Sequence, residues 1–388
     1  MTTARELSAA FRSLHGRAPK IYRAPGRVNI IGEHTDYNGG FVMPAAIDFS
    51  TWVAISPRDD RVVSVFTENF REQFSFNLDD TAPQARGQWS DYVRGVAVTL
   101  EQSGYRLRGA ELHLRGEVPI GSGLSSSAAI EVATGLALSR NSGLSVDRAE
   151  LAQICQRAEN EFVGTRCGIM DQFVSCLGQE GRALLLDCRS LAHELLLLPE
   201  EARLVICNTM VKHKLAAGEY NRRRAQCEAG ISQLVRSLPR VRALRDVSEA
   251  ELESHQDGMS EVVYKRCRHV VTENNRVLKA KQALESDNLP ELGRLMNESH
   301  QSLRDDYEVS CPELDIMVGL AQQMPRVHGA RMAGAGFAGC TINLVAASAA
   351  DEFRRTIARD YEQATGIAAE IYVCRAAAGA REITQLQE

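Results

Sequence analysis

The stretch of sequence that decides the fold reads Val118-Pro119-Ile120-Gly121-Ser122-Gly123-Leu124-Ser125-Ser126-Ser127-Ala128-Ala129. Glycine lets the backbone turn tightly and approach a ligand without an intervening Cβ, and a serine hydroxyl can cap the first turn of a helix. A glycine-rich turn that enters a helix directs several N–H donors and the positive end of the helix dipole to one point. The stretch therefore predicts an anion site with phosphate as its natural ligand, and an ordinary small-residue loop is the alternative.

This loop differs from the two commonest phosphate-binding loops. A Walker A loop requires Gly-Lys-Ser or Gly-Lys-Thr after the glycines, and that sequence is absent here. A dinucleotide-binding fingerprint requires a third glycine where Ser126 stands. The run of three serines is the unusual part, because a hydroxyl at the start of such a helix can also bind Mg²⁺, a hard ion that shares oxygen ligands with nucleotide phosphates.

Composition narrows the class of protein. With 388 residues and 44% hydrophobic content the chain is expected to form two domains. A net charge of −5 argues against a nucleic-acid partner. The ten cysteines contain no C-x-x-C pair, which favours reduced thiols over a disulfide framework or a zinc site. Neither a signal peptide nor a membrane-spanning run is recognised, so we expect a soluble, monomeric, cytoplasmic protein without a membrane partner.

A second unusual segment precedes the loop and is dense in polar side chains. Within ten residues it contains Arg27, Asn29, Glu33, His34 and Asp36, interleaved with apolar residues. Burying so much hydrogen-bonding capacity is costly unless a partner pairs with it. A sugar, whose hydroxyls both donate and accept, is a suitable partner, whereas a polar turn between two strands is the simpler alternative.

Apolar periodicity gives a mixed pattern of helices and strands. Helices are predicted over residues 3–15, 89–103 and 125–140, in a helix capped by Ser145, from 218 onward, and over 247–254, 259–284, 288–303, 311–324 and 349–365. Strands are predicted at 51–56, 61–66, 109–116, 182–187, 194–198, 203–208, 341–345 and 368–374, with a hairpin end at 70–77.

Several charged or small residues allow two interpretations. Glu159 lies beside the apolar stripe of its helix and is either a solvated group or an inward ligand, whereas Asp171, flanked by apolar neighbours, is less suited to the surface. The triplet Arg222–Arg224 is expected on a solvated helix face. The small-residue run Ala333–Cys340 forms either a close-packed hairpin or a backbone segment that packs against the first glycine loop.

Together these segments resemble the GHMP small-molecule kinases, and within them the galactokinases. Gly26–Asn38 is similar to the galactokinase signature, Gly121–Ser127 to the family's phosphate loop and Met332–Cys340 to its third motif. Cys167–Phe173 and Glu219–Arg224 also match galactokinases. The resemblance covers essentially the whole chain.

The third motif departs from the family pattern at two positions. Ala333 stands where the family usually has threonine, and Ala338 where it usually has glycine. Both residues are small, so the departures bear at most on nucleotide affinity.

The resemblance implies an α+β, two-domain GHMP kinase fold. Residues 1–188 would form an N-terminal domain like domain 2 of ribosomal protein S5, carrying the sugar signature and the phosphate loop. Residues 189–388 would form a ferredoxin-like C-terminal domain. The active site would then lie in the cleft between the two domains.

The implied activity is ATP-dependent phosphorylation of the C1 hydroxyl of D-galactose, giving α-D-galactose 1-phosphate and ADP, the first committed step of galactose utilisation. By resemblance, Asp171 takes the hydroxyl proton and Arg27 stabilises charge on Asp171 and the transferring phosphoryl group. Mg²⁺ is implied as the cofactor, with Ser127 and Glu159 as its ligands. The implied sugar-binding residues are Glu33, His34, Thr35, Asp36, Gly168 and Tyr220. The implied nucleotide-binding residues are Trp89, near the adenine, and Gly121, Ser122, Gly123, Leu124, Ser125, Ser126 and Ser127.

Two alternatives remain open at the level of sequence. A kinase for a related sugar, N-acetylgalactosamine or L-arabinose, would differ in the pocket around the sugar 2-position. A non-catalytic galactose and ATP sensor would be expected to have lost residues of the serine loop, yet Ser127, Arg27, Glu159 and Asp171 are all present. The intact set favours the enzyme.

Overall fold

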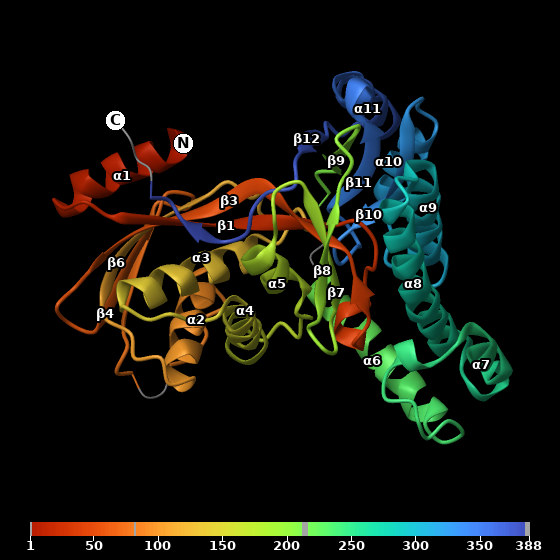
Figure 1. Ribbon diagram of the computed structural model, residues 1–388, viewed down its shortest axis with the longest axis horizontal. Helices are drawn as coiled ribbons and strands as arrows, with labels where there is room; N and C mark the ends of the chain where they lie inside the picture. The colour runs from red at the N-terminus through yellow and green to blue at the C-terminus, as the bar shows by residue number, and fades with distance from the viewer. Residues whose placement is uncertain (1, 81–82, 212–215, 385–388) are drawn as a thin grey trace.

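The computed structural model describes residues 2–80, 83–211 and 216–384. Figure 1 shows an elongated molecule in which the N-terminal sheet and its helices lie at one end and the long C-terminal helices at the other. In these described ranges, no helix combines the length and the apolar character that crossing a membrane requires.

A six-stranded sheet, in the order β13-β1-β3-β6-β4-β5, forms the N-terminal half. Its neighbouring strands are antiparallel except for β4 and β6, which are parallel. The last strand, β13, returns from the C-terminal end of the chain to pair with β1. The strands are β1 (Lys20–Asn29), β3 (Pro44–Pro57), β4 (Val62–Thr67), β5 (Glu72–Asn77), β6 (Ala110–Gly116) and β13 (Arg381–Glu382).

Helices cover both faces of this sheet. Side chains alternate across a strand, so Ile21 of β1 packs with α1 on one face, whereas Tyr22 packs with the helices of the opposite face. The helices are α1 (Thr2–His15) on the first face, and α2 (Ser90–Gln102), α3 (Ser126–Asn141), α4 (Arg148–Arg157) and α5 (Met170–Leu177) on the second.

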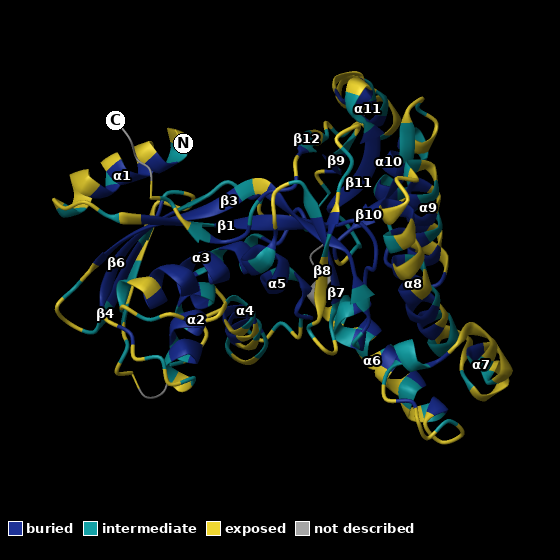
Figure 2. Ribbon diagram, in the orientation of Figure 1, coloured by how far each residue is buried: buried dark blue, intermediate teal, exposed yellow. Residues whose placement is uncertain are grey.

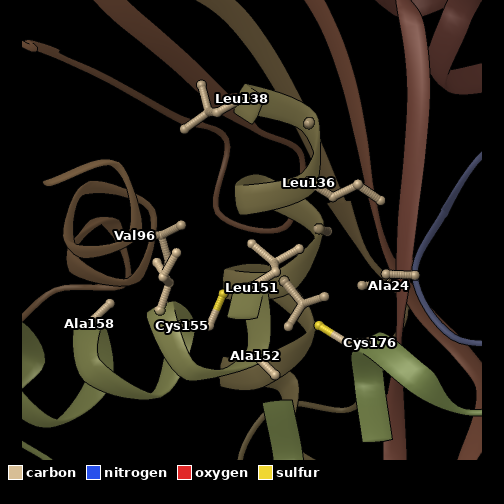
Figure 3. Close-up of a cluster of buried hydrophobic side chains, with 14 of the residues drawn as sticks. Ala24, Val96, Leu136, Leu138, Leu151, Ala152, Cys155, Ala158 and Cys176 are labelled. Atoms are coloured by element: carbon tan, nitrogen blue, oxygen red, sulfur yellow. The ribbon is translucent and has the colours of Figure 1, made fainter. Parts of the chain in front are cut away.

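Helix α3, which follows the glycine loop, lies at the centre of this core. Figure 3 shows Leu151 and Cys155 of α4 beside Val96 of α2 and Leu136 of α3. A Cβ on Gly135 of α3 would lie 2.9 Å from the Leu151 side chain and 3.1 Å from the Val96 side chain. The glycine therefore lets two helices approach α3 closely, which fixes α3 and the loop before it.

The C-terminal half is built on a four-stranded antiparallel sheet in the order β10-β11-β9-β12. Its strands are β9 (Ala202–Asn208), β10 (Val327–Ala333), β11 (Cys340–Ala346) and β12 (Glu370–Cys374). Its helices are α6 (Ala216–Leu234), α7 (Glu249–Ser254), α8 (Glu261–Glu285), α9 (Leu289–Asp305), α10 (Pro312–Gln322) and α11 (Ala350–Thr365). Figure 2 shows most of this sheet buried, its edge strand β12 only partly buried, and the outward faces of the helices exposed.

The two halves share one core. In β9, Val205 packs with α10 and α11, whereas its neighbour Ile206 belongs to a cluster that also contains Val28 and Ile30 of the N-terminal half. A small sheet, in the order β2-β7-β8, completes the connection between the halves. Its strands are β2 (Phe41–Val42), β7 (Arg182–Asp187) and β8 (His193–Leu197).

The α+β expectation is confirmed, but the inner strand β1 and the edge strand β10 were not predicted. β1 contains Pro25, Gly26 and polar side chains, and its register shifts between Pro25 and Arg27. β10 has the sequence of a small-residue segment rather than a β-branched strand. Both strands are buried on both faces, so they lack the alternation of polar and apolar residues that identifies half-buried strands.

The cap of helix α4 also differs from the prediction. Ser145 was the expected N-cap, but the helix begins at Arg148 and Asp147 occupies the N-cap position. Its carboxylate accepts hydrogen bonds from the backbone N–H groups of Ala149 (2.9 Å) and Glu150 (3.2 Å). The carboxylate thus pairs two N–H groups that have no partner within the helix.

This assignment predicts unequal effects for two exposed neighbours. We expect Asp147→Ala to lower the free energy of unfolding by about 1 kcal/mol, because the N-cap hydrogen bonds are lost. Ser145→Ala, the matched control, should change it by less than about 0.5 kcal/mol. Urea unfolding of both variants measures the difference. A larger decrease in the free energy of unfolding in Ser145→Ala would show that Ser145, and not Asp147, caps the helix.

Candidate active site

A cavity of about 260 Å³ lies where the end of β1, α5, the start of α6 and the loop after β10 meet. The cavity brings together residues that are up to 308 positions apart in the chain, between Arg27 and Ala335. Eight of the predicted site residues line it, namely Arg27, Glu33, His34, Asp36, Glu159, Gly168, Asp171 and Tyr220.

Arg27 and Asp171 form a two-pronged ion pair on the wall of the cavity. Arg27 Nε donates to Asp171 Oδ1 and its Nη2 to Oδ2, both at 2.7 Å, and Nη1 donates to the carbonyl of Gly123 at 2.5 Å. Arg27 is only 6% exposed. Burial alone would lower the pKa of Arg27, but the carboxylates of Asp171 and Glu33 raise it. The guanidinium therefore stays charged and holds a carboxylate in a fixed orientation.

The strand irregularity explains how Arg27 reaches the glycine loop. At the bulge, the N–H of Arg27 donates to the carbonyl of Leu124 at 3.1 Å. A Cβ on Gly26 would lie 2.6 Å from that same oxygen, so only glycine permits the approach. The loop is therefore tied to β1 by both the backbone and the side chain of Arg27.

Asp36 lies in the short 3₁₀ helix η1 (Asp36–Asn38), with its carboxylate against the backbone of Gly168. A Cβ on Gly168 would lie 1.9 Å from Asp36 Oδ2. Burial, followed by the negative charge of Asp171, raises the pKa of Asp36 to about 7. The glycine thus makes room for a buried carboxylate that gains from any added hydrogen-bond donor.

Glu33 joins the sugar signature to the third motif. Its Oε1 accepts from the N–H of Gly334 at 2.8 Å and from Arg331 at 3.2 Å, and its Oε2 accepts from Asn29 at 3.1 Å. Arg331 has no exposed surface and also donates to the carbonyls of Asn29 and Ile30. Glu33 lines the cavity with its position set by both halves of the molecule.

On one side of the cavity, the rings of His34, Tyr37 and Tyr220 lie against one another. His34 has a left-handed backbone (φ 63°), and its Nδ1 lies 2.8 Å from the hydroxyl of Tyr37. The ring of Tyr220 lies 5.7 Å from that of His34 and 5.1 Å from that of Tyr37. His34 and Tyr220, both predicted sugar ligands, are therefore neighbours across η1 and the start of α6.

The two glycine-rich segments pack backbone against backbone. A Cβ on Gly334 would lie 3.2 Å from the carbonyl oxygen of Gly123, and one on Gly339 would lie 3.2 Å from that of Ser122. Of the two interpretations of the run Ala333–Cys340, packing against the first glycine loop is therefore confirmed. Both Gly123 (φ 79°) and Gly334 (φ 83°) have left-handed backbones that favour glycine.

The serines of the loop do not act as ordinary helix caps. Ser125 is the N-cap of α3, yet it has a left-handed backbone, and its hydroxyl donates to Asp171 Oδ2 and accepts no hydrogen bond from the helix N–H groups. The hydroxyl of Ser122 donates to the carbonyl of Pro119 at 2.7 Å. The first N–H groups of α3 thus lack a serine cap, and groups of this kind bind anions.

A buried carboxylate cluster lies behind Asp171. Glu159, in the π-helical turn η2 (Ala158–Val163), accepts from Ser127, and the amide Nε2 of Gln172 donates to Glu159 (2.7 Å) and to Glu131 (2.9 Å). Burial, followed by the charge of Asp171, raises the pKa of Glu159 to about 7. Of its two interpretations, the inward-facing one is correct, because Glu159 is 6% exposed.

These oxygens fit a magnesium ion that a nucleotide brings with it. Mg²⁺ is usually held by one or two carboxylates together with substrate phosphates and water. Among the described residues no group of three or more His, Cys, Asp and Glu side chains is placed to hold a metal alone. Ser127 and Glu159 would supply two adjacent oxygen ligands, and a cation there would relieve the unfavourable burial of Glu159.

Of the predicted residues outside the glycine loop, two do not line the cavity. The hydroxyl of Thr35 donates to the backbone carbonyls of Gly32 and Phe41, both at 2.7 Å, so Thr35 shapes the signature loop instead of facing the cavity. Trp89 stacks on Phe70 at 5.8 Å and donates from Nε1 to Glu72. Its assignment to the adenine stays a prediction.

One further expectation was wrong for one of its three residues, since Arg222 is exposed as expected. Arg223, in the triplet expected on a solvated helix face, is 6% exposed. It donates to the carbonyls of Tyr307 and Glu308, both at 2.8 Å, and its guanidinium lies 5.5 Å from the ring of Phe337. Arg223 therefore anchors α6 to the segment after α9.

Four residues that support the site without lining the cavity were not identified from the sequence. They are Arg331, Gln172, Glu131 and Tyr307, which act through other side chains or the backbone. Arg331 left a detectable signal, since it is a lone charge in a run of small and apolar residues. The other three stand in ordinary helical or loop surroundings that give no such signal.

The fold and the site agree with comparisons against known protein families. Residues 9–57 match the galactokinase galactose-binding signature, residues 91–179 the N-terminal domain of GHMP kinases and residues 280–363 their C-terminal domain. Fold and site thus define the class of protein as the GHMP kinases.

Individual relatives narrow the class. A galactokinase of Roseiflexus sp. strain RS-1 is 47% identical over 375 residues, covering 96% of each chain. One from Haemophilus influenzae is 43% identical over 389 residues, covering 99% of this chain and all of the relative. The crystal structure of Lactococcus lactis galactokinase complexed with galactose superposes with a TM-score of 0.95 at 38% identity, covering 98% of this chain and 100% of that one. The chain belongs to the galactokinase family, as its motifs predicted.

The raised pKa of Asp36 predicts how stability depends on pH. The folded protein keeps a proton on Asp36 up to about pH 7, whereas in the unfolded chain Asp36 releases it near its ordinary pKa of 3.8. Stability is therefore lost as pH rises through this window. We expect Asp36→Asn to become more stable than the wild type by a few kcal/mol at pH 8, since one pKa unit corresponds to about 1.4 kcal/mol, and to lose this advantage towards pH 4.

A second aspartate supplies a control of opposite sign. Burial alone would raise the pKa of Asp187, but its hydrogen bond with Arg245 lowers it to about 2. Asp187→Asn should therefore be less stable than the wild type above pH 4, and this deficit should shrink as pH falls towards 2. Thermal unfolding across pH, without ligands, measures both. If the stability difference between Asp36→Asn and the wild type did not change with pH, Asp36 would not be the group that titrates in this range.

Proposed function

We propose that this chain transfers the γ-phosphoryl group of ATP to the C1 hydroxyl of D-galactose, yielding α-D-galactose 1-phosphate and ADP. One observation carries the proposal, the fixed Arg27–Asp171 pair on a cavity wall between the signature segment and the glycine loop. A carboxylate in that place can accept a proton from one bound molecule while a second is held at the start of α3.

The cavity supports a sugar as the first of these molecules. Asp36 and Glu33 present carboxylate oxygens, and His34 and Tyr220 present groups that can donate or accept. A sugar epimer with one hydroxyl misplaced would leave a buried carboxylate without its donor, which is the kind of contact that discriminates strongly between substrates. Gly168 supports this array by leaving room for Asp36.

In the proposed reaction, the C1 hydroxyl oxygen attacks the γ-phosphorus in line with the departing β-phosphate oxygen. The hydroxyl proton passes to an oxygen of Asp171, the new O–P bond forms, and the electrons of the broken P–O bond leave with ADP. Arg27 would orient Asp171 and offset charge on the transferring group, because its guanidinium is held between Asp171 and the glycine loop. The hydroxyl of Ser125 adds a further donor to Asp171.

The glycine loop is proposed to hold the nucleotide. Its backbone from Gly121 to Ser126 would bind the phosphates, with Leu124 as the buried anchor of the loop and Trp89 towards the adenine. Ser127 and Glu159 would hold Mg²⁺, which supplies charge neutralisation between the phosphates. This arrangement replaces the lysine that a Walker A loop provides.

A panel of sugars tests the proposed function. Each sugar is incubated with ATP and Mg²⁺, and ADP release is followed. We expect D-galactose to give the highest kcat/KM. A higher kcat/KM for N-acetylgalactosamine or L-arabinose would show that galactose is not the preferred substrate. Binding of galactose and ATP without turnover would show that the protein is a sensor and not an enzyme.

Removing the charge of Asp171 should separate binding from turnover. We expect Asp171→Asn to lower kcat by at least about 100-fold, in the range found for general acid–base groups, while calorimetry still detects galactose binding. Asp147→Asn is the matched control, because asparagine also caps a helix and the residue is remote from the cavity. Near-normal kcat in Asp171→Asn would exclude Asp171 as the proton acceptor.

A methyl group at position 168 should act through Asp36. We expect Gly168→Ala to raise KM for galactose by about tenfold or more, because its Cβ would displace the Asp36 carboxylate and a lost hydrogen bond to a charged group costs about 1.5–3 kcal/mol. Gly319→Ala in α10, where a Cβ would meet no atom within 4 Å, is the control. Steady-state kinetics compare the two, and equal KM values would show that Asp36 does not depend on Gly168.

A further inference from the structure

One buried amide joins three helical segments around the proposed metal site. Gln172 follows Asp171 in α5 and has no exposed surface. Its Nε2 donates to Glu159 Oε2 at 2.7 Å and to Glu131 Oε2 at 2.9 Å. Glu159 belongs to η2 and Glu131 to α3, the helix that also carries Ser127. Each of the three segments thus contributes a residue of the proposed site.

Glu131 stands in a fixed relation to Ser127, the other proposed metal ligand. The two residues are four positions apart in α3, so their side chains lie on the same face of that helix. Glu131 is fully buried, one turn further along the helix than Ser127. By holding Glu159 against Glu131, the amide of Gln172 therefore holds it against the face of α3 that carries Ser127.

The two oxygens of Glu159 are used differently. Oε2 accepts from the amide of Gln172 and, at 3.5 Å, from the thiol of Cys167, and neither of these hydrogen bonds involves Oε1. A carboxylate that is held through one oxygen has its second oxygen oriented as well. Because Mg²⁺ demands near-ideal octahedral geometry from its ligands, this arrangement suits a carboxylate that must present one oxygen in one direction.

Packing alone does not account for Gln172. Its own Oε1 is buried without a hydrogen-bond partner among the described residues, and so is Oε1 of Glu131. An unpaired buried polar group is destabilising, and a methionine would fill the same space without that cost. The two N–H groups, which are both paired, are therefore the part of the Gln172 side chain that the site uses.

We propose that Gln172 is a positioning residue that fixes the Glu159 carboxylate, so that one of its oxygens and the hydroxyl of Ser127 together face the cation that accompanies the nucleotide phosphates. The inference rests on the proposed function for the nucleotide and Mg²⁺. Partners that orient a metal ligand typically change metal affinity by about 10- to 100-fold when they are removed. Because Gln172 follows Asp171 directly, the helix that carries the proposed proton acceptor also places the metal ligand.

The test removes the amide and reads the contribution of the metal to nucleotide binding. Gln172→Met keeps the length of the side chain and removes both N–H donors. Calorimetry on the full-length protein measures the affinity for AMP-PNP, an ATP analogue with a non-transferable phosphoryl group, in Mg²⁺ and in EDTA. We expect Mg²⁺ to strengthen binding by about tenfold or more in the wild type and by less than about threefold in Gln172→Met. Affinity in EDTA should differ by less than about twofold.

Turnover should show the same dependence on the metal. We expect Gln172→Met to raise the Mg²⁺ concentration for half-maximal rate by about tenfold, and high Mg²⁺ to restore kcat to within about threefold of the wild type. KM for galactose should change by less than about threefold, because the hydrogen bonds that hold Asp171 come from Arg27 and Ser125. A general disturbance of the fold would not be reversed by adding metal.

Two further variants separate this role from the loss of a buried amide in general. Asn343 in β11 is also fully buried; its Nδ2 donates to the carbonyl of Val205 at 2.9 Å, and its Oδ1 has no partner among the described residues. Asn343→Leu, the matched control, should keep the full Mg²⁺ effect. Gln172→Asn keeps an amide that is one methylene too short to join Glu131 and Glu159, and serves if Gln172→Met does not fold; it should reduce the Mg²⁺ effect by at least about threefold.

Two results would overturn the proposal: a folded Gln172 variant with the wild-type Mg²⁺ effect, or an equal loss of that effect in Asn343→Leu. A wild type that binds AMP-PNP equally well with and without Mg²⁺ would refute the proposed metal site and this role of Gln172 with it. A protein that shows the expected Mg²⁺ effects but does not phosphorylate galactose would refute the proposed function alone.

Discussion

The buried guanidinium of Arg331 is the contact on which the arrangement of the site depends. It extends from β10 in the C-terminal half and donates to the carbonyls of Asn29, Ile30 and Met332 and to Glu33. A buried charge without such partners would be very costly. Because most of these partners lie at the end of β1, the charge is satisfied only when the two halves are joined in this one way. The signature segment is thereby positioned before any ligand arrives.

Close contact between the two glycine segments extends this constraint to the phosphate loop. The backbone around Gly334 touches Gly123 on one side and donates to Glu33 on the other. Arg27 reaches the same carbonyl of Gly123 from β1. A shift of the loop would therefore disturb both the carboxylate proposed to bind sugar and the pair proposed to move the proton. Precise placement of two substrates is what phosphoryl transfer chiefly requires of a protein.

The sequence predicted those parts of the molecule in which the residue types themselves indicate a site. The glycine–serine loop before α3, the α+β class and eight cavity residues could be identified because glycines, carboxylates and arginines in apolar surroundings need a reason to be there. Strands β1 and β10 were missed because burial on both faces removes their periodicity. Thr35 was placed in the site, yet its hydroxyl is used by the backbone. Contacts such as Arg223 with Tyr307 join distant segments, and no local pattern encodes them.

The charge balance of the cavity explains why a site this rigid still gains from its ligands. Glu33, Asp36, Glu159 and Asp171 line it, while Arg27 is the one cationic side chain among the described residues that line it. Burial and mutual repulsion raise the pKa values of Asp36 and Glu159 to about 7, so folding creates the site at a cost in stability, as active sites often do. Hydroxyl donors at Asp36 and a cation at Glu159 would each relieve part of that cost. A sugar that lacks the hydroxyl facing Asp36 would leave the cost of burying that carboxylate unrelieved. Selectivity between sugars would then follow from the unfavourable burial of Asp36.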